Sequence, residues 1–130
     1  MQTEIFTLCD AATVSGGKMN LLGSFDTIHA AEFPYKHPIC AVATKLRFDL
    51  GEEGEHEFEI SLSDPDMHPI LNPIKQKIVI QIPDRSQTHH HIWNILGFDM
   101  HSPGEYYFEL KVDGDIKSRF PMYVKKLERN

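Results

Sequence analysis

Apolar and polar residues alternate along four segments between residues 55 and 127, and this two-residue period is the strongest constraint on the fold. Successive side chains of a β-strand point to opposite faces, so the period is typical of half-buried antiparallel strands. Turn residues follow almost every segment. The apolar stripes are Phe58/Ile60/Leu62, Ile78/Ile80/Ile82, Ile92/Leu96/Phe98 and Tyr106/Phe108/Leu110/Val112.

The pattern of the whole chain predicts an all-β protein with about eight short strands and no helical period. Such a series predicts a single-domain antiparallel β-sandwich over residues 1–130, of the immunoglobulin-like or C2-like kind. The expected strands cover residues 4–14, 19–26, 39–50, 56–63, 76–82, 89–98, 105–112 and 116–126.

Two hairpins can be predicted with their register. A two-residue loop at Gly16-Gly17 pairs Val14 with Met19, Ala12 with Leu21 and Leu8 with Phe25, which matches apolar to apolar residues.

At Asp113-Gly114 a two-residue turn in regular register would place Lys117 and Arg119 opposite core residues. We therefore expect a three-residue loop that ends with Gly114 in the left-handed region. This loop pairs Glu109 with Lys117, Phe108 with Ser118 and Tyr106 with Phe120.

Composition favours a small cytoplasmic domain. A chain of 130 residues buries roughly 65–70% of its unfolded surface, so stability requires no disulfide or metal. Cys9 and Cys40 follow no CxxC spacing and are expected to be buried free thiols in a reducing compartment. The first residues lack a basic signal region, and no apolar run is long enough for a membrane span.

The charge balance argues against a nucleic-acid partner. The chain carries 13 Lys and Arg against 19 Asp and Glu, a net charge of −6, and such a chain repels phosphate backbones.

Several motifs together resemble an uncharacterised bacterial β-sandwich family that is known only as a domain of unknown function. The resemblance rests on Cys9-Asp10-Ala11-Ala12, the segment from Gly17 to Asp26, Pro103-Gly104-Glu105-Tyr106 and Val112-Asp113-Gly114. It covers nearly the whole chain and implies the fold but no activity. The Pro-Gly-x-Tyr segment is also similar to the tyrosine corner of immunoglobulin-like sandwiches, whose hydroxyl bonds to the backbone.

Short motifs that suggest chemistry have structural explanations. Gly16-Gly17-Lys18 lacks the remaining residues of a phosphate-binding loop and suits a hairpin turn. Asp10 lies opposite Gly23 in the predicted register, so a bond to local backbone explains it better than a carboxylate pair with Asp26. In His89-His90-His91 the first and third rings share one face of a strand, which could bind a metal adventitiously.

One end of the predicted sandwich collects metal-ligating side chains. If the strands alternate in direction, the loops near residues 27–38, 64–75 and 99–104 lie together. A metal or small-ligand site is thus a hypothesis, with His37, His68, His101, Asp64 and Asp66 as its ligands. The alternative is that these side chains form a solvated polar rim without a ligand, in which the Asp residues initiate turns. The same end also holds His29, Glu32 and Asp99.

The outer face of the strand over 89–98 is the predicted interface. If Ile92, Leu96 and Phe98 face the core, then His91, Trp93 and Ile95 point outward. Exposed apolar side chains as large as Trp93 and Ile95 must be covered by other residues. Either the segment with Phe33 and Tyr35 folds over them, or they bind a protein partner or a second copy.

The sequence therefore predicts a soluble, non-enzymatic β-sandwich that binds protein or self-associates. No Ser, Cys or His lies in a pattern typical of a nucleophile with its base, and no cofactor is expected. The alternative function is a metal- or ligand-binding module at the histidine-rich end.

Overall fold

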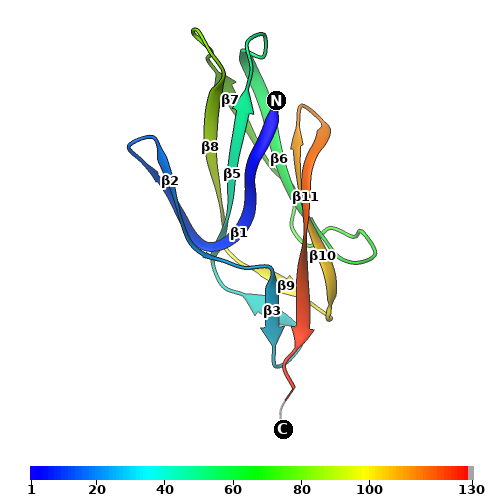
Figure 1. Cartoon of the computed structure of the whole chain (residues 1–130). Helices are drawn as coiled ribbons and strands as arrows, with labels where there is room; N and C mark the ends of the chain where they lie inside the picture. The colour runs from blue at the N-terminus through cyan, green and yellow to red at the C-terminus, as the bar shows by residue number, and fades with distance from the viewer. Residues whose placement is uncertain (129–130) are drawn as a thin grey trace.

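The computed structural model describes residues 1–128 and shows an all-β chain with eleven strands. Figure 1 shows their arrangement. The strands are β1 (Gln2–Ser15), β2 (Lys18–Ser24), β3 (Thr27–Ala30), β4 (Tyr35–His37), β5 (Cys40–Phe48), β6 (Gly54–Ser63), β7 (Ile74–Ile80), β8 (Gln87–Ile95), β9 (Phe98–Met100), β10 (Gly104–Val112) and β11 (Asp115–Lys126).

The strands form a four-stranded sheet of order β2-β1-β5-β8 and a five-stranded sheet of order β3-β11-β10-β6-β7. A two-stranded sheet joins β4 to β9. All pairs are antiparallel except β3 with β11, which run parallel. The predictions of about eight strands and of purely antiparallel pairing are thus wrong in these details, while the all-β class is confirmed.

Two predicted strands are each divided in the structure. The strand expected over 19–26 becomes β2 and β3, because the chain crosses from one sheet to the other at Asp26, whose carbonyl accepts a 2.7 Å bond from the N–H of Tyr123. The strand expected over 89–98 ends at Ile95 and resumes as β9 after Gly97. In the part of the chain that is described, no helix is long and apolar enough to cross a membrane.

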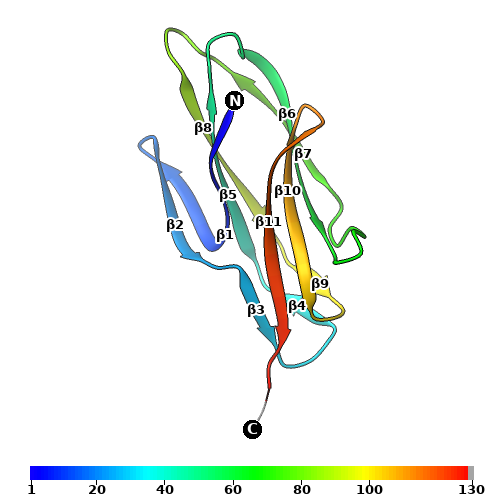
Figure 2. The same ribbon diagram turned by 45° about the vertical axis from the view of Figure 1, so that its right-hand side comes forward.

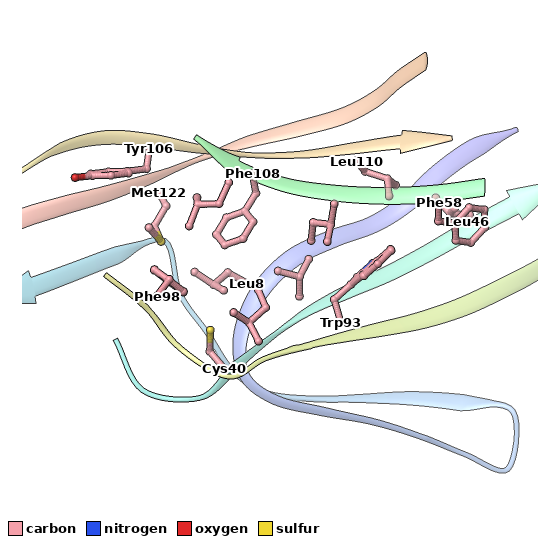
Figure 3. Close-up of a cluster of buried hydrophobic side chains, with 14 of the residues drawn as sticks. Leu8, Cys40, Leu46, Phe58, Trp93, Phe98, Tyr106, Phe108, Leu110 and Met122 are labelled. Carbon is pink, nitrogen blue, oxygen red and sulfur yellow. The ribbon is translucent and has the colours of Figure 1, made fainter. Parts of the chain in front are cut away.

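The core lies between the two larger sheets and draws side chains from both (Figure 3). The predicted stripes of β6 and β10 are confirmed, because their alternate residues from Phe58 to Leu62 and from Tyr106 to Val112 are buried. Phe33 and Tyr35 pack against this core from the segment before β5. The predicted tyrosine corner is present, since the Tyr106 hydroxyl donates a 2.6 Å bond to the Ser102 carbonyl.

The first hairpin has the predicted register. Val14 pairs with Met19 and Ala12 with Leu21 across the turn at Gly16-Gly17. Both glycines have positive φ (57° and 72°), which the tight two-residue turn requires. The N–H of Phe25 bonds to the Leu8 carbonyl at 3.0 Å and extends the pairing as predicted.

The last hairpin differs from the prediction. Val112 pairs with Asp115, so the loop has two residues, and a bulge then shifts the register between Leu110 and Lys111. Beyond the bulge Leu110 faces Ser118, and Phe108 lies opposite Phe120 with ring centroids 5.2 Å apart. The expected left-handed Gly114 is confirmed with φ 87°. The bulge, rather than a longer loop, keeps the charged residues off the core face.

Strand β1 belongs to two structural parts of the chain. Its first half pairs with β5 up to Cys9, and its second half pairs only with β2. The hairpin of residues 10–24, called here the arm, therefore leaves the body at the side of the molecule (Figures 1 and 2). Ala12 and Met19 of the arm pack against a small cluster of Cys9, Ala41 and Ala43.

Candidate functional site

The predicted interface on β8 is wrong because its side chains point inward. Trp93 and Ile95 are only 3% and 2% exposed and belong to the main core, as Figure 3 shows for Trp93. His91 lies on the same face, with its ring 4.4 Å from the Trp93 ring. These three residues therefore form no outer surface. Of the residues expected inside, Leu96 is 83% exposed and only Phe98 is in the core.

Gly97 explains why the side chains of β8 face the opposite way from the prediction. Inward-facing residues have odd numbers in β8 and even numbers in β9, so the two-residue period is interrupted between Ile95 and Phe98. Gly97 has φ 117°, and a Cβ there would lie 2.9 Å from the His37 carbonyl oxygen. A glycine inside a strand pattern marks such a break, and this was the available sequence signal.

The inner face of β8 carries a row of aromatic and polar rings. The rings of His89 and His91 stack 6.0 Å apart, which confirms that the two share a face. Within residues 1–128, His89 Nε2, Trp93 Nε1 and the Thr44 hydroxyl are buried without a hydrogen-bond partner. Burial lowers the pKa of His89, and it lowers the pKa of His91 to about 4. Both rings are therefore neutral at pH 7.

The loop after β6 brings three of the predicted metal ligands together. One ligand atom each of Asp64, Asp66 and His68 lies within 4.8 Å of the others. Asp64 Oδ1 also accepts the backbone N–H groups of Asp66 at 2.9 Å and His68 at 2.7 Å. The bond from His68 contributes most to a lowered pKa of the Asp64 carboxyl. The carboxylate is thus ionised at neutral pH and also orders the loop.

The other two predicted ligands lie outside this group. The His37 ring contacts Phe25 and Phe98 in tilted arrangements, with centroid distances of 5.6 and 5.4 Å, and burial lowers its pKa. His101 is exposed at the end of β9. The predicted five-residue set is therefore reduced to three residues of one loop, because β4 pairs with β9 and places the half-buried His37 ring beside Phe25 and Phe98.

Exposed apolar side chains gather on the arm. Leu22 is 70% exposed, Val14 46% and Leu21 39%. A mainly apolar hollow of about 300 Å³ lies on the arm and is lined by Ala11, Ala12, Thr13, Asn20, Leu21 and Leu22. Large exposed apolar surface of this kind is typical of protein contacts. Two further exposed residues lie next to the Cys40–Ile95 pair, since Ile39 precedes Cys40 and Leu96 follows Ile95.

Sequence reasoning did not single out the arm. The available signal was the consecutive pair Leu21-Leu22, because neighbouring residues of a strand point to opposite faces and one leucine must leave the core side. The arm also places Asp10 beside Gly23, as the predicted register requires, while the bond from Asp10 to local backbone stays a prediction. A Cβ at Gly23 would lie within 3.0 Å of the Asp10 carboxylate, which explains the glycine at this position.

The cysteines are the free, buried thiols that the sequence predicted. Burial raises the pKa of Cys9 and raises that of Cys40 to about 11. Both thiols are protonated at neutral pH, and a protonated thiol is a poor nucleophile. The two residues are therefore parts of the packed interior.

The chain matches a family of unknown function, DUF6941, over residues 4–125. This match covers more than nine tenths of the sequence, so the chain belongs to that family. The family resemblance expected from the sequence motifs is confirmed. A search of curated proteins gave no match.

Solved structures with a similar fold share little sequence with this chain. A β-glucosidase from Listeria innocua in complex with isofagomine has a TM-score of 0.54 and 10% identity. The match covers 95% of this chain and 16% of that one. The Pseudomonas fluorescens alkylpurine DNA glycosylase AlkC, bound to DNA with an abasic site analog, has a TM-score of 0.48 and 11% identity. That match covers 92% of this chain and 30% of the glycosylase chain. At this identity the glucosidase match shows a similar fold alone.

Proposed function

We propose that this protein is a non-enzymatic binding domain that works through protein–protein contact made by the arm, residues 10–24. Its proposed scaffold is an immunoglobulin-like β-sandwich, which the tyrosine corner at Tyr106 supports. The observation that carries the proposal is the exposed apolar surface of Val14, Leu21 and Leu22 on a hairpin outside the main core.

The packing of the arm supports this proposal. Residues 10–15 have no strand partner except β2, and β2 has no strand partner except β1 within the described part of the chain. An isolated two-stranded hairpin is marginally stable in water. Contact with another protein would bury Leu22 and would stabilise the arm, with about 25 cal/mol gained per Å² of apolar surface removed from water.

Site-specific photo-cross-linking in cells tests the proposal. A photo-cross-linking amino acid at Leu22 is expected to give one discrete protein adduct, which mass spectrometry identifies. The matched control is the same amino acid at Leu96, which is also exposed but lies outside the arm. Equal adducts at the two positions, or none at Leu22, would contradict a contact made by the arm.

A second candidate function is divalent-metal binding at the loop of Asp64, Asp66 and His68. The observation that favours it is the convergence of two carboxylates and an imidazole within 4.8 Å. Zn²⁺ accepts both kinds of ligand.

Calorimetric titration of the purified protein with Zn²⁺ tests the metal site. We expect stoichiometric binding that is weakened at least tenfold in His68→Ala and unchanged in His101→Ala, because only His68 belongs to the cluster. Neither variant replaces Asp64, because its carboxylate accepts the backbone bonds that order the loop. Equal loss in both variants, or no binding by the wild type, would exclude this function.

A further inference from the structure

We infer that the partner of the arm is a second copy of this chain, joined β2 to β2 in antiparallel orientation about a two-fold axis at Leu22. The inference rests on the proposed function of the arm and names its partner. It follows from the free edge of β2, from the positions of its charges and from the residues that the pairing aligns.

The free edge of β2 lacks protection against pairing. The strand has seven residues, and Lys18 is its only charged residue. Sheet edges usually avoid association by being short or by carrying charges. The five-stranded sheet shows both devices, since β3 has four residues, and Lys75 and Lys77 on β7 form ion pairs with Glu59 and Glu55 of β6.

Strand β8 is the other edge of the four-stranded sheet, but it offers less apolar surface. Its large apolar residues Trp93 and Ile95 are buried, and Ile92 packs against the cluster of Cys9, Ala41 and Ala43. Pairing at β8 would therefore remove less apolar surface from water than pairing at β2, where Leu21 and Leu22 are exposed.

The charges at the two ends of β2 select one register. Lys18 begins the strand and Asp26 follows its end, four residues before and four residues after Leu22. In an antiparallel pair centred on Leu22, Lys18 of each copy lies at the end of the partner's β2, near Asp26, which stands just beyond the strand where the chain crosses to the other sheet. Opposite charges that lie near each other across a strand pair favour its register, and such complementarity sets orientation more than affinity.

The same register aligns apolar residues across four strands. Ala11 of β1 already lies opposite Leu22 of β2. At the two-fold axis Leu22 meets its own copy, so a continuous row runs from Ala11 through both leucines to the second Ala11. Leu21 meets Gly23, which has no side chain to compete for space. Each Leu22 lies at the rim of the hollow on its own arm, so the pairing covers apolar surface of both copies.

The resulting assembly is closed. A two-fold contact uses the same surface on both copies, so it ends at two chains. The two four-stranded sheets become one continuous sheet through their arms.

Disulfide cross-linking tests whether the two-fold axis of the dimer lies at Leu22. Residues directly opposite each other in antiparallel strands have Cα atoms about 4.5–5.5 Å apart, a separation that a disulfide can span. Leu22→Cys is expected to form a covalent dimer under mild oxidation, while Leu21→Cys and Leu96→Cys are expected to form much less. The native Cys9 and Cys40 are buried and do not compete.

Charge exchange tests the register. Lys18→Glu and Asp26→Lys should each weaken the dimer by roughly 2- to 30-fold, because each change affects two exposed ion pairs. The double variant Lys18→Glu/Asp26→Lys should recover wild-type dimerisation. Sedimentation velocity at low salt over a range of concentrations measures all four proteins.

Several outcomes would overturn the inference. Cross-linking that is equal at residues 21 and 22, or no recovery in the double variant, excludes this register. A sedimenting mass that exceeds two chains and increases with concentration indicates head-to-tail pairing of β2 with β8. A monomeric wild type excludes the second copy altogether. In that case an in-cell adduct of Leu22 with another protein would still support the proposed function, whereas the absence of any adduct would remove both.

Discussion

At the residue scale, the buried histidines of this protein connect packing to pH. His91 stacks on His89 and meets the Trp93 ring edge-on, and burial lowers its pKa from the ordinary 6.5 to about 4. Its neutral form is thus favoured in the folded state. The corresponding stability is fully present above pH 6.5 and is lost as the pH falls from 6.5 toward 4.

We expect the free energy of unfolding to fall by roughly 2–3 kcal/mol between pH 7 and pH 4.5 through His91 alone. The lowered pKa values of His37 and His89 act in the same direction. Urea unfolding at the two pH values measures the effect. His91→Leu should reduce this pH dependence, and the exposed control His101→Leu should leave it unchanged. The same pH dependence in His91→Leu and the wild type would contradict the assignment.

The pKa of His56 is shifted in the opposite direction. Burial favours its neutral form, but bonds to the Asp113 carboxylate at 2.6 Å and the Glu52 carbonyl at 2.7 Å outweigh burial and raise its pKa. Stability from this ion pair is present below pH 6.5 and is lost as the pH rises above the folded pKa. The direction of a histidine shift therefore depends on the partners that the fold supplies.

At the element scale, Gly97 determines which face of β8 is buried. Gly97→Ala should lower the free energy of unfolding by about 1–3 kcal/mol, because both its φ of 117° and the nearby His37 carbonyl oppose a Cβ. Gly51 is a matched control, with φ 97° and no atom within 4 Å of the place that a Cβ would take. Chemical unfolding of Gly97→Ala and Gly51→Ala isolates the steric contribution. Equal losses would show that the contact with His37 does not fix the break.

The two hairpins show which strand registers can be predicted from the amino-acid sequence. The β1–β2 register was predictable because the loop length and the apolar matches agree on one answer. The β10–β11 hairpin was not, because a bulge and a longer loop place the same side chains on the core face. For β10 and β11 the apolar pattern indicates which side chains face the core, and only the three-dimensional pairing distinguishes the two registers that satisfy this pattern.

For the molecule as a whole, the division between body and arm is the feature that matters for function. The body buries its apolar stripes between the two larger sheets, while Leu21 and Leu22 of the arm are exposed. Figures 1 and 2 show the arm leaving the body. The inferred dimer would extend the four-stranded sheet without changing the body. The loop of Asp64, Asp66 and His68 and the arm lie in different parts of the chain, so their tests are independent.

The amino-acid sequence was sufficient to predict the all-β class, the stripes of β6 and β10, the first hairpin, the tyrosine corner and the buried free cysteines. These features depend on side-chain alternation and on local turn chemistry, which neighbouring residues encode. Tertiary contacts were needed to show that Trp93 and Ile95 lie in the core, that His37 lies apart from Asp64, Asp66 and His68, and that residues 10–24 project as an arm. Each of these depends on contacts between distant segments, such as Gly97 with His37, and an alternating pattern carries no information about which distant segments meet.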